Sequence, residues 1–373
     1  MRKKVFRVTT VPISLKVLMK NQLRYLNNFF DVYGVSSDGP EILDVKKKEG
    51  IKVIVLPMKR AISLHNDIVS LFRMILLLIK QRPTIIHSHT PKAGFISMFA
   101  AWITKVPIRL HTVAGLPMTS KKGIERNILK FVEIITYKFA TKIYSNSLGL
   151  KLFLIQENMI KEEKIKILGN GSTNGIDLKY FKPQNSKSND NKKFRFIFIG
   201  RLVGDKGVNE LITVFERLNK KFKSLSLYLI GEQEKELDPL SNKTIKIIKN
   251  NKSIKSFGYV NDIRNILSSS NCLVLPSHRE GFPNVLLQAM AMNIPAITTD
   301  INGCNEIIKD SINGVLIRPK NFVDLYNSME KIHKDKEFYE SLKGNCRNSV
   351  LKFDSSKMHY LINKEYQSYL RKI

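Results

Sequence analysis

The chain has 373 residues, 43% of them hydrophobic, and this length suits two domains of ordinary size better than one. It carries 62 Lys and Arg against 32 Asp and Glu, a net charge of +30, which excludes an acidic disordered protein and favours anionic partners. Its three cysteines include no Cys-x-x-Cys pair, which excludes a disulfide scaffold and a cysteine zinc cluster, so we expect a reducing, cytoplasmic compartment.

Short β-branched runs alternate with amphipathic segments along the first half. Helices are expected over residues 67–80 and 124–139. Strands that alternate with helices predict a parallel sheet with both faces covered. The expected strands of this half are 5–8, 53–56, 84–87, 108–113 and 142–144.

The same alternation starts again after a polar, turn-rich stretch at 183–191, which predicts a linker. The fold class is therefore predicted as α/β, with two doubly wound, Rossmann-like domains at 1–180 and 181–354. Ligands of such sheets bind beyond the carboxyl ends of the strands, so we expect the site in a cleft between the domains. The expected strands of the second half are 194–199, 225–230, 272–275 and 295–298.

Apolar runs in this chain are short. The longest, at 74–79 and 98–103, end at Lys80 and Thr104, whereas a membrane-spanning helix needs about 20 apolar residues. The basic N-terminus is not followed by the long apolar run of a signal peptide. We therefore expect neither a membrane span nor a signal peptide.

The most informative stretch follows the first strand of the second half. Gly200 opens a turn, and a helix is expected to start near Gly207. Arg201 and Lys206 stand between the carboxyl end of the strand and the amino end of the helix. Backbone amides at a helix start attract phosphate, and two cations add charge-assisted hydrogen bonds to a diphosphate. For this stretch alone, an ordinary glycine turn with exposed cations is the alternative.

A second stretch places a carboxylate and amides after another buried strand. Glu280 lies in the loop, and Gly281 allows the backbone to approach a ligand closely. Pro283 and Asn284 begin a helix, with Gln288 one turn in. A fixed acceptor, exposed amides and a side-chain amide suit the hydroxyls of a neutral ligand. A carboxylate that only stabilises the helix start is the alternative for Glu280.

Several motifs occur together in the order typical of one enzyme family. They are Gly-Arg-Leu at 200–202 with Lys-Gly at 206–207, Gly-Glu at 231–232, Glu-Gly-Phe-Pro-Asn at 280–284, Ile-Asn-Gly-Cys-Asn-Glu at 301–306 and Asn-Gly-Val-Leu-Ile at 313–317. The set resembles family-4 retaining glycosyltransferases. The resemblance implies the GT-B fold, with two Rossmann-like domains facing across a cleft and the nucleotide-sugar donor held mainly by the second. It also implies that the helical pattern at 355–373 returns to the first domain.

The resemblance implies a role for each matching position. Arg201 and Lys206 would hold the donor diphosphate, and Glu280 would contact the transferred sugar as the first glutamate of the Glu-x7-Glu signature. The second glutamate, which grips the ribose, is replaced by Gln288, so nucleotide affinity is expected to change more than the chemistry. The donor-binding residues implied are Arg201, Lys206, Gly231, Gly281, Phe282, Pro283, Asn284 and Gln288.

Acceptor-side candidates lie in the first half. Ser14 and Lys16 follow the first strand, where relatives have paired glycines, and both side chains can donate hydrogen bonds. His89 follows a later strand, where an active-site loop is expected. The segment His-Thr-Val-Ala-Gly-Leu-Pro at 111–117 resembles a subgroup that acts in capsule or O-antigen assembly. A catalytic role and a structural hydrogen bond are both open for His111, because it lies inside a strand pattern.

The expected reaction is transfer of a sugar, with retained anomeric configuration, from a nucleoside-diphosphate sugar to an acceptor hydroxyl. UDP is favoured as the nucleotide, and the expected acceptor is a saccharide linked to a polyprenyl diphosphate. The chain has no Asp-x-Asp and no metal-ligand spacing, so we expect no metal or other cofactor. Arg201 and Lys206 would neutralise the leaving diphosphate instead.

The basic charge is concentrated in the first half. Residues 1–190 have an excess of 19 positive charges, and residues 191–373 have an excess of 11. With the apolar and basic segment 119–130, this predicts peripheral contact with the anionic inner face of the cell membrane. A lysine-rich composition with solvated helix faces is the alternative.

Two other functions fit parts of the sequence. An isomerase similar to UDP-sugar 2-epimerases would share the two-domain fold, but it needs a histidine and several carboxylates around the sugar, and only Glu280 is well placed. A basic nucleic-acid-binding protein fits the net charge. Its basic residues are dispersed, however, and no stacking-aromatic motif accompanies them, so we expect no nucleic-acid partner.

Overall fold

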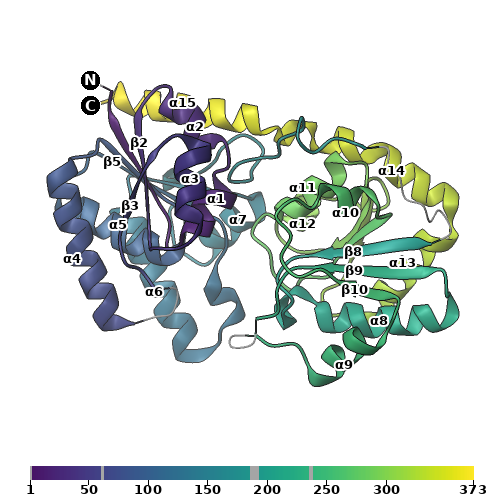
Figure 1. Cartoon of the computed structure of the whole chain (residues 1–373). Coiled ribbons are helices and arrows are strands. Elements are labelled where there is room, and N and C mark those ends of the chain that lie inside the picture. The colour runs from purple at the N-terminus through teal and green to yellow at the C-terminus, as the bar shows by residue number, and fades with distance from the viewer. Residues whose placement is uncertain (1, 60–62, 185–192, 235–237) are drawn as a thin grey trace. The chain divides into compact units, whose positions relative to one another are not determined.

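The computed structural model describes residues 2–59, 63–184, 193–234 and 238–373 (Figure 1). The chain forms two compact units: unit 1 is Met1–Gly175 with Ser355–Ile373, and unit 2 is Ile176–Asp354. The division falls before the expected boundary at residue 180, because the Ile176 N–H donates to the Phe353 carbonyl at 2.8 Å. Of the expected linker at 183–191, residues 185–191 lie outside the described ranges. The cleft expected between the domains stays a prediction.

Unit 1 is built on a seven-stranded parallel sheet in the order β3-β2-β1-β4-β5-β6-β7 (Figure 1). Its strands are β1 (Lys4–Val8), β2 (Asp31–Ser36), β3 (Lys52–Val55), β4 (Ile85–Ser88), β5 (Ile108–Val113), β6 (Lys142–Ser145) and β7 (Ile165–Ile167). Its helices are α1 (Pro12–Leu18), α2 (Gln22–Asn27), α3 (Glu41–Glu49), α4 (Leu64–Gln81), α5 (Pro91–Ile103), α6 (Gly123–Phe139), α7 (Leu148–Gln156) and α15 (Ser355–Leu370), with 3-10 turns η1 (Pro117–Ser120) and η2 (Glu162–Lys164).

Helices cover both faces of this sheet because successive strand residues point to opposite faces. Val5 of β1 packs with Leu23 of α2 and with Tyr366 of α15 in one core. Phe6, the next residue, packs with Met74 of α4 in the other core, to which α5 and α6 also contribute. Buried strand residues on both faces are what distinguish a parallel sheet from a half-exposed antiparallel one.

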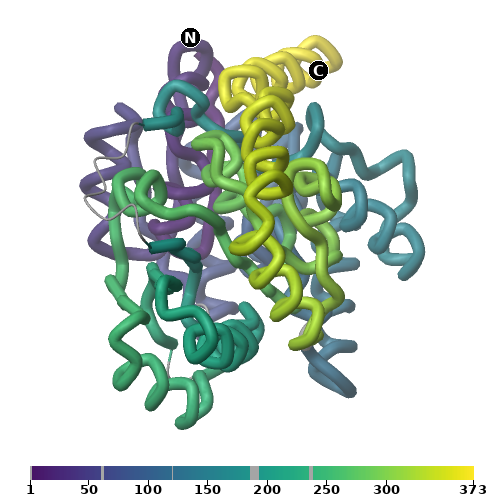
Figure 2. The backbone as a smooth tube through the Cα atoms, turned by 90° about the vertical axis from the view of Figure 1, so that its right-hand side faces the viewer, coloured from purple at the N-terminus to yellow at the C-terminus, as the bar shows by residue number. Residues whose placement is uncertain are grey.

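The C-terminal helix α15 belongs to unit 1, and Figure 2 shows it in yellow beside the purple N-terminal segment. His359 Nε2 lies 2.9 Å from Asn174 Oδ1. The Tyr366 hydroxyl lies 2.6 Å from His87 Nδ1 at the end of β4. The helix is therefore fixed by buried polar contacts as well as by apolar packing.

Unit 2 is built on a six-stranded parallel sheet in the order β10-β9-β8-β11-β12-β13. Its strands are β8 (Phe194–Ile199), β9 (Leu225–Ile230), β10 (Ile254–Ser256), β11 (Cys272–Leu275), β12 (Ala296–Thr299) and β13 (Gly314–Ile317). Its helices are α8 (Val208–Lys221), α9 (Asn242–Asn250), α10 (Arg264–Ser268), α11 (Asn284–Ala291), α12 (Cys304–Ile307), α13 (Phe322–Lys334) and α14 (Lys336–Val350), with 3-10 turns η3 (Gly204–Lys206) and η4 (Leu351–Phe353). The predicted α/β class with two Rossmann-like units is confirmed.

Strand order reverses once in each sheet, between β1 and β4 in unit 1 and between β8 and β11 in unit 2. At such a point the connections leave in opposite directions, so the loops after the two strands are the expected ligand-binding loops.

Four strands, β2, β7, β10 and β13, were not predicted from the sequence. Two of these, β7 and β10, are only three residues long. The strand β2 contains Gly34, and β13 starts at Gly314, which weakens the strand pattern.

Candidate active site

The loops after β8 and β11 meet where the strand order of unit 2 reverses. The β8 loop includes η3, which ends at Lys206, and the β11 loop leads to Pro283 at the start of α11. The His278 N–H donates to the Asp205 carbonyl at 2.8 Å. The Arg279 guanidinium lies 2.6 Å from the Asp205 carboxylate. The two loops therefore form one connected surface at the carboxyl edge of the sheet.

Lys206 and Glu280 are in direct contact across these loops. Lys206 Nζ lies 2.7 Å from Glu280 Oε1, and the Ser277 hydroxyl donates to the same oxygen at 2.8 Å. Only 18% of the Lys206 side chain and 13% of the Glu280 side chain are exposed. Within the part of the chain that the structure describes, Glu280 Oε2 has no hydrogen bond. One carboxylate oxygen is thus fixed, and the other is available to accept from a ligand hydroxyl.

Arg201 lies in the β8 loop but has a different partner. Its guanidinium is paired with Glu234, which follows β9, and 48% of its side chain is exposed. Among the described residues, no direct contact joins Arg201 to Lys206 or Glu280. An ion pair this exposed contributes little stability. A guanidinium in such a pair is able to release its carboxylate for a phosphate group, with which arginine forms two parallel hydrogen bonds.

Two glycines bring neighbouring loops into close contact. Gly231 follows β9 with φ +136°, and a Cβ there would lie 1.9 Å from the Gly200 carbonyl oxygen. Gly303 follows β12 with φ +79°, and a Cβ there would lie 2.2 Å from the Gly281 carbonyl oxygen. No side chain fits at either position. Gly231 and Gly281, both predicted donor contacts, therefore lie in the tightly packed loops of the carboxyl edge.

The start of α11 corrects one detail of the prediction. The Phe282 ring is buried and packs edge-on against Phe353 with ring centroids 5.3 Å apart, so its side chain belongs to the core. Only the backbone of Phe282 is therefore able to contact a ligand. Pro283 precedes α11, and Asn284 is the first residue of that helix. Gln288 is partly exposed one turn in, and among the described residues its side chain makes no hydrogen bond.

A histidine and a carboxylate that lie close to the loop after β11 were not singled out from the sequence. His278 Nε2 lies 2.9 Å from Glu210 Oε1 in the first turn of α8. Burial opposes ionisation of Glu210, but hydrogen bonds from His278 and from the backbone, together with the charges of His278 and Lys320, outweigh it and lower the pKa of Glu210. Sequence proximity to Lys206 and Glu280 was a usable signal for four of the residues that were missed, whereas Glu210 and Glu234 join the loops only through the fold. The residues missed are Asp205, Glu210, Glu234, Ser277, His278 and Arg279.

On the acceptor side, the structure does not group the predicted residues. Ser14 and Lys16 both lie on α1, and Lys16 Nζ is 2.9 Å from Asp44 Oδ2 of α3. That ion pair holds Lys16 against a neighbouring helix. His89 follows β4, and in the described ranges no hydrogen bond or ion pair joins it to Ser14 or Lys16. His89 is the candidate that lies at the strand-order reversal of unit 1.

His89 is buried next to an arginine that the sequence did not single out. Its Nε2 lies 2.8 Å from Nη2 of Arg7, a fully buried residue of β1 that also donates to Gln22 Oε1 at 2.6 Å. An arginine can only donate, so Nε2 accepts and the proton of His89 sits on Nδ1. Burial, with the charges of His87 and Arg7, lowers the pKa of His89 well below its usual value. His89 is therefore held neutral in one tautomer.

His111 is buried inside β5, where its Nδ1 lies 2.8 Å from the Ser88 hydroxyl and its ring lies against Gly94 of α5. Burial lowers the pKa of His111 to about 3. So weak a base takes up no proton near neutral pH. Of the two roles open from the sequence, the geometry favours the structural one.

Comparison with known proteins identifies the family. Residues 8–147 match the family described as glycosyl transferase 4-like, and residues 181–349 match glycosyl transferases group 1. The capsular polysaccharide biosynthesis glycosyltransferase CapM of Staphylococcus aureus is 35% identical over 376 residues, which cover 99% of this chain and 98% of that protein. The chain belongs to the group 1 glycosyltransferases. The predicted resemblance is confirmed, and membership removes the nucleic-acid-binding alternative.

Two further proteins extend the comparison. The UDP-Gal:alpha-D-GlcNAc-diphosphoundecaprenol alpha-1,3-galactosyltransferase of Escherichia coli is 28% identical over 337 residues, 87% of this chain and 85% of that protein. The crystal structure of Anabaena HepE in complex with UDP and glucose superposes with a TM-score of 0.83 at 17% identity, covering 98% of this chain and all of the other. At this low sequence identity, the likeness to HepE shows that the two chains share a fold.

The buried state of His111 predicts how stability changes with pH. Its folded pKa of about 3 is below its unfolded value of 6.5, so its contribution to stability is complete above pH 6.5 and is lost as the pH falls toward 3. The slope is about 1.4 kcal/mol per pH unit. Urea unfolding at several pH values should show a shallower acid loss for His111→Asn than for the wild type.

The matched control is His65→Asn, which replaces an exposed histidine of α4 and should keep the wild-type slope. A wild-type slope in the His111→Asn variant, together with lost transfer activity, would contradict the structural role and favour the catalytic one.

Proposed function

We propose that this glycosyltransferase moves a sugar from a UDP-sugar to a lipid-linked saccharide during surface-polysaccharide synthesis, with retention of the anomeric configuration. The observation that carries the proposal is the contact between Lys206 and Glu280 at the strand-order reversal of unit 2. A cation and a carboxylate side by side suit a diphosphate and the sugar attached to it. The names of the relatives support UDP, a diphosphoundecaprenol-linked acceptor and capsule synthesis.

Arg201 and Lys206 stabilise the leaving group in this proposal. Negative charge grows on the diphosphate as the bond from the sugar C1 to the phosphate oxygen breaks. Donors fixed in place before the reaction stabilise that charge most, because they need no rearrangement. The Lys206 ammonium has three protons, so it can keep Glu280 and also donate to a phosphate oxygen.

Glu280 positions the sugar, since its Oε2 can accept from a ring hydroxyl while Oε1 is held by Lys206 and Ser277. The partly exposed Gln288 can accept from one ribose hydroxyl and donate to another oxygen. Retention follows if the acceptor attacks the face that the diphosphate leaves. A bond then forms from the acceptor oxygen to C1, and the hydroxyl proton passes to the departing phosphate oxygen.

We further propose that transfer needs no metal ion. The described ranges hold no group of three or more His, Cys, Asp or Glu side chains placed to bind one. The positive charge comes instead from Arg201, Lys206 and the amino end of the fourteen-residue helix α8, which directly follows their loop.

A lipid-linked acceptor would bring the enzyme to the inner face of the cell membrane, where we propose peripheral contact. The described part of the chain has no helix that is both long and apolar enough to span a bilayer. Attraction between basic side chains and anionic lipids would supply the contact.

Removing either cation should slow transfer by about 100- to 1000-fold, the usual effect of deleting one donor to a developing anion. Arg201→Ala and Lys206→Ala are the variants, and kcat/KM for the donor is the measurement. Arg217→Ala removes the same charge from the exposed face of α8 in the same unit and should behave like the wild type. Near-normal transfer by Arg201→Ala, in a protein that unfolds at the wild-type temperature, would contradict the assignment.

Chelation tests the metal-independent mechanism. Transfer in excess EDTA should match transfer without it, because the leaving group is neutralised by side chains and backbone amides. Loss of activity that returns only with added Mg²⁺ or Mn²⁺ would show that these groups do not suffice.

One observation keeps the isomerase as a second candidate. His278 and Glu210 lie beside the loop of Glu280, which partly meets the need for a histidine and further carboxylates. A transferase should leave a UDP-sugar unchanged until an acceptor is added, whereas an isomerase converts it alone. We expect no new sugar isomer and almost no free UDP without acceptor, as followed by chromatography of the nucleotides.

A further inference from the structure

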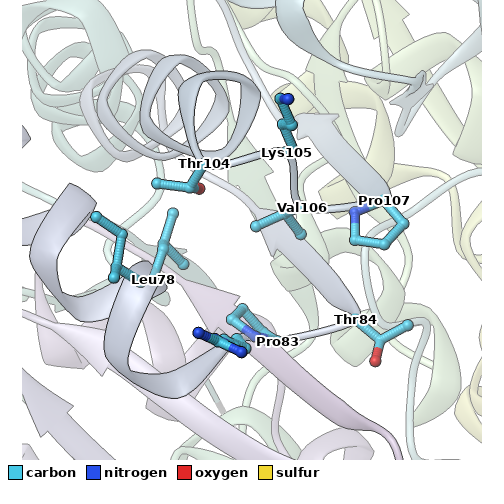
Figure 3. Close-up of a pocket in the computed structure, with 9 residues that line it drawn as sticks. Leu78, Pro83, Thr84, Thr104, Lys105, Val106 and Pro107 are labelled. Carbon is cyan, nitrogen blue, oxygen red and sulfur yellow. The ribbon is translucent and has the colours of Figure 1, made fainter.

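A cavity of about 360 Å³ lies in unit 1 at the amino-terminal edge of the sheet (Figure 3). It is bounded by the last residues of α4 and α5 and by the segments that lead into β4 and β5, and Figure 3 shows Thr104, Lys105 and Val106 opposite Pro83 and Thr84. This edge is opposite the carboxyl edge that holds His89. The cavity therefore belongs to no part of the candidate active site.

Two cations line this cavity at positions that favour glycine. Arg82 ends α4 with φ +46°, and Lys105 follows α5 with φ +55°. Their backbone N–H groups close the helix ends by donating to Leu78 at 2.8 Å and to Trp102 at 3.2 Å. Glycine is the residue that fits such a C-terminal position without strain. Both helices thus place an exposed cation, at a conformational cost, over the same cavity.

No acid balances these cations. The lining residues include no Asp or Glu, and among the described residues neither Arg82 nor Lys105 makes an ion pair. Arg109 adds positive charge behind the cavity, where its Nη1 donates to the carbonyl of Val106 at 2.8 Å. The cavity therefore has the charge complementary to a phosphate group.

An exposed apolar stripe on α4 runs up to this cavity. Its members recur every three or four residues, so they share one face of the helix, and Phe72 and Ile79 expose 61% and 54% of their surface. Ile79 also lines the cavity, which makes stripe and cavity continuous. The residues of the stripe are Leu64, Ile68, Phe72, Leu76 and Ile79.

The charges along the stripe are also one-sided. Arg73 and Lys80 are the exposed charged residues of α4, and both are basic. The acid of this helix, Asp67, is bound to Lys92 of α5 at 2.7 Å. An apolar face flanked by cations is the pattern of a helix that lies in the interface of an anionic bilayer. The segment 119–130, which was predicted from the sequence to contact the membrane, contributes two further exposed apolar residues, Ile124 and Ile128 of α6. Helix α6 packs against α5 on the same face of the sheet.

We propose that the α4 stripe lies along the surface of an anionic membrane and that the cavity between Arg82 and Lys105 receives the phosphate of a lipid head group. Apolar side chains enter the boundary of the acyl chains, and the two cations bind the phosphate beside them. The reason for such a site rests on the proposed function, which needs a membrane-bound acceptor. The binding itself needs neither donor nor acceptor and can be measured without them.

Co-sedimentation with vesicles of phosphatidylcholine and phosphatidylglycerol tests the cavity. Arg82→Gly and Lys105→Gly should each lower the fraction bound about fivefold, the usual contribution of one basic residue near an anionic leaflet. Lys320→Gly is the matched control, because Lys320 in unit 2 also has a positive φ, +60°, and is exposed. Glycine suits all three positions, so thermal unfolding should stay at or above the wild-type temperature.

Phe72→Ser tests the stripe and should lower the fraction bound about tenfold, since a large apolar group leaves the interface. Val323→Ser is its control, as Val323 is an exposed apolar residue on α13 of unit 2. Vesicles of phosphatidylcholine alone should bind the wild type much more weakly.

Three results would overturn the proposal. The wild type could fail to bind anionic vesicles at low salt, or Lys105→Gly could bind as well as Lys320→Gly. In the third result, inorganic phosphate alone raises the unfolding temperature of the wild type but not of Lys105→Gly, while Lys105→Gly binds vesicles as the wild type does. That result would show that the ligand of the cavity is a soluble phosphate and not a lipid. Normal vesicle binding by a protein that transfers no sugar would instead contradict only the proposed function.

Discussion

The ion pair between Lys206 and Glu280 is the interaction on which the candidate site depends. The two residues are 74 positions apart, and they meet because β8 and β11 are neighbours in a parallel sheet and end at the same edge. A partly buried cation and a partly buried carboxylate stabilise each other as a pair, since each alone would be left partly desolvated. The pair therefore fixes the two loops to each other and presents the second carboxylate oxygen to a ligand.

Around this pair, the other loops are fixed by backbone packing. Gly231 and Gly303 allow carbonyl groups of neighbouring loops to approach within distances that any side chain would prevent. Arg201 differs, because its partner Glu234 is on a partly exposed loop and its own side chain is half in water. The candidate site thus combines a carboxylate held by Lys206 and Ser277 with a more exposed arginine that is paired to a different loop.

The two edges of the sheet in unit 1 differ in electrostatic character. At the carboxyl edge, Arg7 is buried, and its hydrogen bonds to Gln22 and His89 go to neutral acceptors. Burial lowers the pKa values of the histidines there, so they stay neutral beside the arginine. At the amino edge, Arg82 and Lys105 are exposed to water and keep their charge at the surface. A buried arginine with neutral acceptors at one edge and an exposed basic cavity at the other are thus separated by the length of the strands.

The sequence by itself determined the fold class, the loops of the candidate donor site and the choice of Arg201, Lys206 and Glu280 as its candidate residues. It did so because these features are local: strands alternate with helices, and each motif lies within a few residues of a strand end. Only the tertiary structure decided which of these residues touch, that Phe282 turns into the core and that His111 is buried at the Ser88 hydroxyl. It also decided where Arg7, Glu210 and the α4 stripe lie. Those facts depend on which strands are neighbours in each sheet and which helix faces no other element covers. The spacing of residues along the chain does not reveal strand order or uncovered helix faces.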